Sequence, residues 1–237
     1  MRIRGLASLA VLLPCVACSG PAVLSTRTEL TFHLEELRGT SVAIWPIGSL
    51  HLLGSVPQTV ADEYQTPDRF AEQLSQRLGA AVMPHVKAGS LQPADVVKAF
   101  GSKDLRHLLT PPPKTDGTID DAGLGFTDET LAAYVRKLRS QAVLKDVRYV
   151  ILPHDLNVAR GWSRMRNAAG GGSSTSADTT ARLRVVVLDV PHGKVVWEGK
   201  VIASEGSTFM KVKALHDVEK GLVTHFSNAV RGVIDTL

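Results

Sequence analysis

If residues 158–166 are extended, six side chains have the residue types and the spacing to bind an anionic group. In an extended strand, residues two apart share one face, and arginine pairs with carboxylates and phosphates through parallel hydrogen bonds. The candidate partner-binding residues are Arg160, Trp162, Arg164, Arg166, Arg182 and Arg184. We expect a basic face that holds an acidic partner, lipid phosphates or an anionic glycan. The alternative is that these arginines are only the solvated side of an antiparallel sheet.

The histidines and acidic residues do not have the spacing of a metal site. None of the eight histidines forms an H-x-x-x-H or H-E-x-x-H pattern. His154 and Asp155 are adjacent, so their side chains point to opposite faces of a strand. The loop with Asp116, Asp120 and Asp121 lacks the alternating oxygen ligands and the glycine of a calcium loop. We therefore expect no metal, and histidines with structural roles.

Motifs of catalysis are missing as well. The sequence contains no G-x-S-x-G and no S-x-x-K motif. Gly193 and Lys194 lack the preceding glycine and the following hydroxyl residue of a phosphate loop. Cys15 and Cys18 are spaced as C-x-x-C, but they lie in an apolar leader rather than in a βαβ unit. We expect no enzyme and no cofactor, and an enzyme with a dispersed, unrecognised active site remains an alternative.

The first twenty residues have the organisation of an export signal. Arg2 and Arg4 precede an apolar run over 6–13, which is too short to span a bilayer as a stable anchor. Ala17 and Cys18 follow this run. A small residue before a cysteine at this place resembles the lipobox of bacterial lipoproteins.

The resemblance to lipoproteins implies how the chain is processed and where it lies. Residues 1–17 would be the signal peptide, and Cys18 would carry the lipid, palmitate included, that anchors the protein to a membrane. In this family an aspartate after the cysteine often retains the protein at the inner membrane, whereas Ser19 follows Cys18 here. The resemblance therefore implies the periplasmic face of the outer membrane, with the inner membrane as the less favoured alternative. Cys15 stands where the family usually has leucine.

Composition is that of a folded domain without disulfides. The sequence has 27 Lys and Arg against 23 Asp and Glu, a net charge of +4 that falls to +2 when the leader with Arg2 and Arg4 is removed. This small excess does not indicate a nucleic-acid partner. The mature chain keeps one cysteine at most, and lipidation would use its thiol. About 220 residues are enough for one domain with a substantial core.

Hydrophobic patterns divide the rest of the chain into strands and helices. Expected strands cover 42–47, 81–86, 147–158, 183–188 and 195–202, and expected helices cover 67–78, 93–100, 102–109, 128–142 and 215–233. Thr66 is the expected N-cap and Pro67 the first residue of its helix, which we expect Gly79 to end. The glycine-rich stretch over 167–179 predicts a flexible hairpin tip. Residues 18–40 predict a tether, and residues 41–237 a single domain.

This order of elements predicts an α/β (α+β) fold, a single three-layer domain in which helices flank a mixed sheet. A hairpin lies in its C-terminal half, and a C-terminal helix closes it. The segments 41–47, 66–79 and 149–152, together with the run Val185–Trp197, resemble the lipoprotein group of the curli-secretion protein CsgG and the penicillin-binding-protein activator LpoB. The resemblance implies the same fold. The chain offers at most one candidate for the two long pore-forming hairpins of CsgG-type proteins.

The expected lipid anchor, the missing catalytic motifs and the expected basic face together predict a binding protein. We expect a non-enzymatic, lipid-anchored envelope lipoprotein whose periplasmic domain binds or regulates another envelope protein. One alternative is an oligomeric secretion or export component of the curli type, which would be a homo-oligomer. The other is an envelope enzyme with a dispersed active site. Besides the membrane that holds the anchor, an envelope protein is the expected partner.

Overall fold

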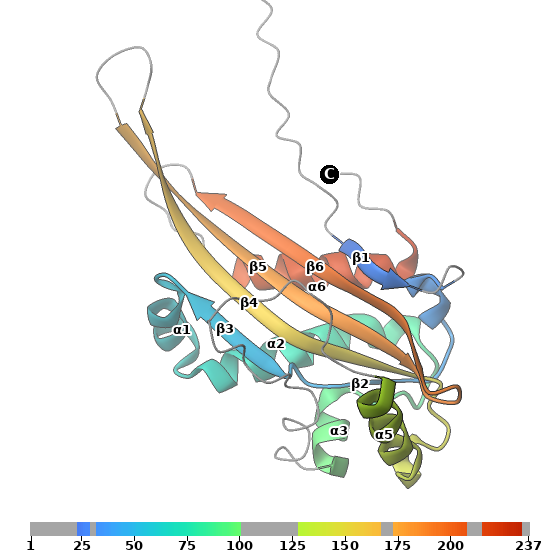
Figure 1. Ribbon diagram of the computed structural model, residues 1–237. Helices are drawn as coiled ribbons and strands as arrows, with labels where there is room; N and C mark the ends of the chain where they lie inside the picture. The colour runs from blue at the N-terminus through green and yellow to red at the C-terminus, as the bar shows by residue number, and fades with distance from the viewer. Residues whose placement is uncertain (1–22, 29–31, 101–127, 167–172, 208–214, 234–237) are drawn as a thin grey trace, which may run out of the picture.

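Helices cover both faces of a mixed six-stranded sheet in the computed structural model (Figure 1). The structure describes residues 23–28, 32–100, 128–166, 173–207 and 215–233. The strands are β1 (Val23–Thr28), β2 (Val42–Ile44), β3 (Ser49–Leu53), β4 (Tyr149–Arg166), β5 (Ser173–Asp189) and β6 (Lys194–Ser207). The principal helices are α1 (Val56–Tyr64), α2 (Pro67–Val82), α3 (Pro93–Phe100), α5 (Asp128–Arg139) and α6 (Leu215–Arg231). The predicted α/β class with a mixed sheet is confirmed.

Antiparallel pairing builds most of the sheet. Its strands follow the order β1-β6-β5-β4-β2, and β3 also pairs with β4. The contacts β1–β6, β6–β5 and β5–β4 are antiparallel, whereas β2 and β3 both run parallel to β4. The predicted hairpins are confirmed, because β4 pairs with β5 and β5 with β6.

The β4–β5 hairpin is longer than predicted and extends past the rest of the sheet (Figure 1). Its pairing continues to Arg166 and Ser173, whereas β6 ends opposite Ala177. Residues 173–179, expected in a flexible tip, therefore belong to β5. The residues between the strands, 167–172, lie outside the described part of the chain.

Two hydrophobic clusters make the molecule three-layered, as predicted. On one face of the sheet, α1, α2 and α6 pack through residues such as Val60, Leu74 and Phe226. On the other face, Val96 of α3 and Leu138 of α5 pack against sheet residues such as Val150 and Leu188. The predicted closing helix is α6, whose apolar positions every three or four residues are buried.

Helix α2 begins as predicted and ends later than predicted. Thr66 accepts a hydrogen bond from the Arg69 amide, and Pro67 is the first residue of the helix. Gly79 does not end the helix. A Cβ at this position would come within 2.6 Å of the Pro93 ring. This glycine instead lets α3 approach α2 closely. The strand predicted over 81–86 is wrong: α2 continues to Val82, and a short 3-10 helix, η2 (Met83–His85), follows.

The expected tether is shorter than predicted. Within residues 18–40, β1 pairs with β6, and the 3-10 helix η1 (Leu34–Leu37) inserts Leu34 and Leu37 into the core under α6. Burying these two leucines stabilises the domain by about 2 kcal/mol each. The described part of residues 18–40 therefore belongs to the folded domain.

Candidate functional site

The predicted arginines do not share one face of the sheet. On β4, Leu156 and Val158 enter the core under α1, and Arg160 follows them with the same alternation. On β5, Arg182 and Arg184 lie opposite Asn157 and Asp155 of β4, which have the other alternation. Arg160 therefore lies on the covered face, and Arg182 and Arg184 lie on the opposite face.

Arg160 is a buried structural link rather than part of an exposed basic surface. Its side chain is 8% exposed. Nε donates to the Thr179 hydroxyl at 2.9 Å, and Nη1 donates to the Thr59 hydroxyl at 2.8 Å, so Arg160 connects β4, β5 and α1. The expectation that it faces solvent is wrong, because Gly54 turns the chain so that α1 covers it. Trp162, Arg164 and Arg166 lie in β4, but their side chains are outside the described residues.

We call the polar part of the sheet beyond α3 and α5 the open face. Its side chains alternate along β4, β5 and β6 with buried residues and along β3 with the partly buried Leu50 and Leu52, and none of them is itself buried. They are Ser49, His51, Asp155, Asn157, Arg182, Arg184 and Lys200. On the same side of the sheet, Val150 and Leu188 are instead covered by α3 and α5. The open face therefore places the cationic side chains of Arg182, Arg184 and Lys200 on the same side of the sheet as the Asp155 carboxylate.

Three residues of the open face have the types of a hydrolase triad in another arrangement. The Ser49 hydroxyl donates to Asp155 Oδ1 at 2.8 Å, and His51 Nε2 lies 3.2 Å from the same oxygen. In a Ser-His-Asp triad, histidine lies between the other two and takes the serine proton. Here both Ser49 and His51 bind the carboxylate, so this geometry joins β3 to β4 and does not activate Ser49. The sequence did not show this cluster, because it depends on a parallel register between strands about a hundred residues apart.

His154, next to Asp155, lies in the core. It is 2% exposed, and neither ring nitrogen has a hydrogen-bond partner. Burial lowers its pKa to about 4, so the imidazole is neutral at physiological pH. Among the described residues, no group of three or more His, Cys, Asp and Glu side chains could hold a metal ion.

A buried carboxylate lies where α1, α2 and α6 meet. Glu219 Oε2 accepts a hydrogen bond from the Tyr64 hydroxyl at 2.9 Å and pairs with Arg77. Arg77 also contacts His216 Nδ1 at 2.9 Å. Glu219 Oε1 is buried without a partner, and burial raises the pKa of this carboxyl. The cluster connects three helices inside the domain.

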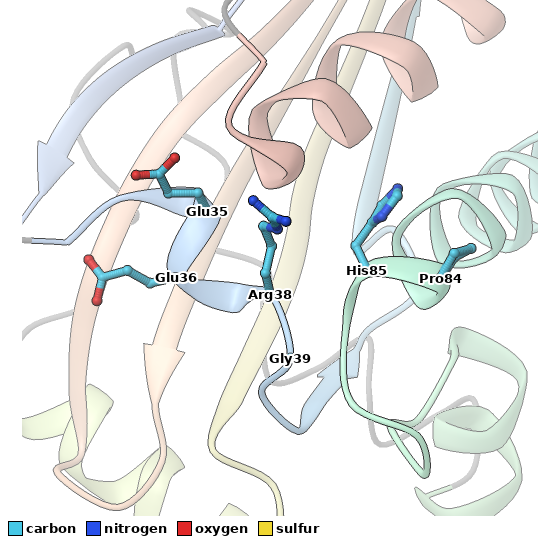
Figure 2. Close-up of a pocket in the computed structure, with 6 residues that line it drawn as sticks. All are labelled: Glu35, Glu36, Arg38, Gly39, Pro84 and His85. Carbon is cyan, nitrogen blue, oxygen red and sulfur yellow. The ribbon is translucent and has the colours of Figure 1, made fainter.

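The described residues form two hollows in the surface, a groove and a shallower depression. A groove of about 740 Å³ lies between the β2–β3 connection, the first half of α2 and α3. A second hollow of about 690 Å³ is shallow, and Figure 2 shows the carboxylates of Glu35 and Glu36 directed away from Arg38 and His85. Because its polar groups do not converge, this second hollow lacks the arrangement of a ligand site.

Comparisons with known proteins give structural neighbours only. No protein-family model matches the chain, and no curated protein is similar to it. Similar solved structures include lipoprotein GNA1162 from Neisseria meningitidis, with 14% identity over 80% of this chain and 99% of that chain and a TM-score of 0.31. The PelC dodecamer from Paraburkholderia phytofirmans has 14% identity over 91% and 98% and a TM-score of 0.29. The hypothetical protein CT253 from Chlamydia trachomatis has 12% identity over 82% and 99% and a TM-score of 0.39.

At these low identities and TM-scores, the similarities establish no shared function. The resemblance to the CsgG and LpoB group stays a prediction. Among the described helices, none has the length and apolar character needed to cross a membrane.

Proposed function

We propose that the protein is a non-enzymatic, lipid-anchored lipoprotein of the bacterial envelope whose domain binds another envelope protein. The open face carries the proposal. Arg182 and Arg184 both extend from β5, a central strand, so their backbone positions are fixed before a partner arrives. Arg182 is exposed, and Arg184 and Lys200 are only partly covered. Such a surface suits a partner with carboxylates, because arginine binds them through paired hydrogen bonds.

The lipid anchor gives this surface its place. The pattern that ends at Cys18 supports lipidation, and Ser19 supports the periplasmic face of the outer membrane as the destination. Confinement to a membrane raises the effective concentration of the domain for neighbours in that plane. A moderate affinity at the open face is then sufficient for stable association.

Site-specific crosslinking in cells tests the binding surface. A photoreactive amino acid at Asn157 of the open face should give an adduct with a partner protein. The same amino acid at Gln73, exposed on α2 across the sheet, should not. Arg182→Glu should reduce the Asn157 adduct, whereas Arg69→Glu on α2 makes the same charge change and should leave it unchanged. Equal adducts at both positions, or an adduct that Arg182→Glu does not affect, would contradict the proposal.

Fractionation tests the anchor separately. Cys18→Ala should release the protein from the membrane fraction without changing its unfolding transition. If the variant stays with the membrane at the wild-type level, the prediction that a lipid on Cys18 anchors the protein is wrong.

A second candidate is an oligomeric export component. The observation that favours it is that β1 lies at one edge of the sheet and β2 and β3 lie at the other, and within the described residues β1 and β3 each pair with one strand only. Head-to-tail pairing of such edges between copies could close a ring. The mass of the detergent-extracted protein distinguishes the two candidates, since a strict monomer excludes a ring.

A further inference from the structure

Among the described residues, strand β3 has an unpaired edge that nothing in its own sequence protects. Within this part of the chain it pairs with β4 on one side only, over Ser49–Leu53. Natural edge strands are commonly blocked by charged residues, proline or a bulge. The sequence of β3 is Ser-Leu-His-Leu-Leu, without proline, lysine or arginine, and its last residue, Leu53, is 46% exposed. Its pairing with β4 has no register shift.

The direction of the free backbone groups follows from one hydrogen bond. The Gly48 amide donates to the Pro153 carbonyl at 3.0 Å, so Gly48 is directed toward β4. Successive residues of a strand direct their amide and carbonyl groups to alternate sides. Leu50 and Leu52 therefore bond to β4, and the backbone groups of Ser49, His51 and Leu53 are directed away from it. An added strand could bind these three residues.

The larger groove adjoins this edge and would hold a side chain of the added strand. Ser49 and Leu50 are part of its lining. Its apolar walls come from Pro46, Ile47, Pro67, Ala71, Pro93, Ala94 and Val97. A volume of about 740 Å³ is within the range of sites that hold a ligand or an anchoring side chain. The groove therefore favours an apolar residue next to the edge.

Charge on the groove favours a basic segment. Asp68 and Glu72 of α2 line it, against Lys98 of α3. Glu72 is exposed, and its carboxylate accepts a hydrogen bond from the neutral Gln76 amide at 3.3 Å. A lysine or arginine of the bound segment would therefore gain more at the α2 wall than an acidic residue would.

We infer that β3 and the adjoining groove bind an extended segment of a partner protein by strand addition, and that this segment alternates apolar and basic residues. Backbone hydrogen bonds give such a complex its affinity, and the groove and Glu72 give its specificity. The site shares Ser49 and His51 with the open face, but the inference does not rest on the proposed function. Arg182→Glu is expected to leave it unchanged.

Fluorescence anisotropy with synthetic probes tests the inference on the detergent-extracted full chain. The first probe is a labelled nine-residue peptide that alternates valine and lysine. The second alternates valine and glutamate, and the third is the lysine probe with alternate backbone amides methylated on its bonding edge. We expect the lysine probe to bind at least about tenfold more tightly than either of the others. Methylation removes the backbone donors and places a methyl group on the bonding edge, so it blocks strand addition without any change in the protein.

Matched variants locate the site. Glu72→Gln should weaken binding of the lysine probe about threefold, whereas Gln73→Lys, the same change in charge one residue along α2 and outside the groove lining, should leave it unchanged. The inference is overturned if the lysine probe does not bind, if the methylated or glutamate probe binds equally well, or if the two variants act alike. A concentration-dependent mass without probe binding would assign the edge to a second copy of the chain instead.

Discussion

The ion pair between Arg77 and Glu219 predicts that its two partners contribute unequally to stability. The Glu219 side chain is 1% exposed and that of Arg77 is 39% exposed. Arg77→Met leaves a buried carboxylate that keeps the Tyr64 hydroxyl as a donor. Glu219→Gln leaves a guanidinium that already reaches water, and the amide oxygen can still accept from Tyr64. Removal of the arginine should therefore cost more.

The expected magnitudes follow from burial. Removing one partner of a buried ion pair costs about 3–5 kcal/mol, and solvent around Arg77 reduces this to about 2 kcal/mol. Glu219→Gln should cost about 1 kcal/mol or less, since a neutral hydrogen bond replaces the pair. In a domain of this size, the melting temperature falls by about 2–4 °C for each kcal/mol. The double variant should be close to Glu219→Gln alone.

The pH dependence gives the same prediction a second measurement. Burial raises the pKa of Glu219, so the folded protein binds this proton more tightly than the unfolded chain. Stability from this group is therefore lost as pH rises through the folded pKa. Arg77 lowers that pKa, and Arg77→Met consequently raises it further. The cost of Arg77→Met should shrink as pH falls from about 7.5 to about 5, because Glu219 is protonated more readily in the variant.

Urea unfolding followed by circular dichroism, at both pH values, measures these differences. Tyr64, His216 and Glu63 are the other titrating groups near the pair, and comparison with the wild type at each pH removes their common contribution. The reasoning is refuted if Glu219→Gln costs as much as Arg77→Met at pH 7.5. It is refuted equally if the cost of Arg77→Met is the same at both pH values.

Three more predictions concern the sheet and its surroundings, with urea unfolding as the measurement. Gly54→Ala, at φ 70° and with its new methyl 2.6 Å from the Arg160 carbonyl oxygen, should cost about 3 kcal/mol or more, whereas Gly89→Ala, at φ 87° in open space, should cost only about 1 kcal/mol. Burial lowers the pKa of His154 to about 4, so the unfolded chain binds its proton more readily and stability falls with pH below about 6.5. His154→Leu should therefore lose less stability than the wild type between pH 7.5 and pH 5, and an equal loss would contradict the burial of this imidazole. Thr179→Val should cost about 1–3 kcal/mol, because the buried Arg160 Nε loses its acceptor; a neutral effect would show that Arg160 finds water there.

Local signals in the sequence predicted the elements whose structure is decided locally. Thr66 and Pro67 predicted the start of α2 because an N-cap needs only its own helix. The 3.6-residue period from Leu215 to Val230 predicted α6, since one broad face of this helix is buried. Val233, expected on the same face, is 44% exposed because the helix has ended at Arg231.

Signals that depend on distant neighbours failed. Neither β3 nor α1 was predicted from the sequence. β3 is a strand only through its parallel pairing with β4, and its own five residues do not indicate that partner. Gly79 looked like a helix end, whereas its role is contact with Pro93. In both cases the local structure depends on contact with a residue of another helix or strand.

The misplaced Arg160 had a signal in the sequence that could have corrected it. The same period of two that groups Arg160 with Trp162 also groups it with Leu156 and Val158, which are core residues in type. Extended from the apolar end of β4, the alternation places Arg160 on the covered face. Our prediction instead grouped Arg160 with the arginines that follow it in β4. It therefore placed a side chain of the covered face in solvent.

The open face and the β3 groove share one hydrogen bond, and this makes their independence a physical question. Ser49 lines the groove, and its hydroxyl donates to Asp155 of the open face, which lies opposite Arg184. Ser49→Ala removes that bond without changing the backbone groups that an added strand would use. If the two surfaces are independent, this variant changes crosslinking at Asn157 and leaves binding of the lysine probe unchanged. If both change together, Asp155 transmits an effect between β3 and β4, and one partner that contacts both surfaces becomes the simpler explanation.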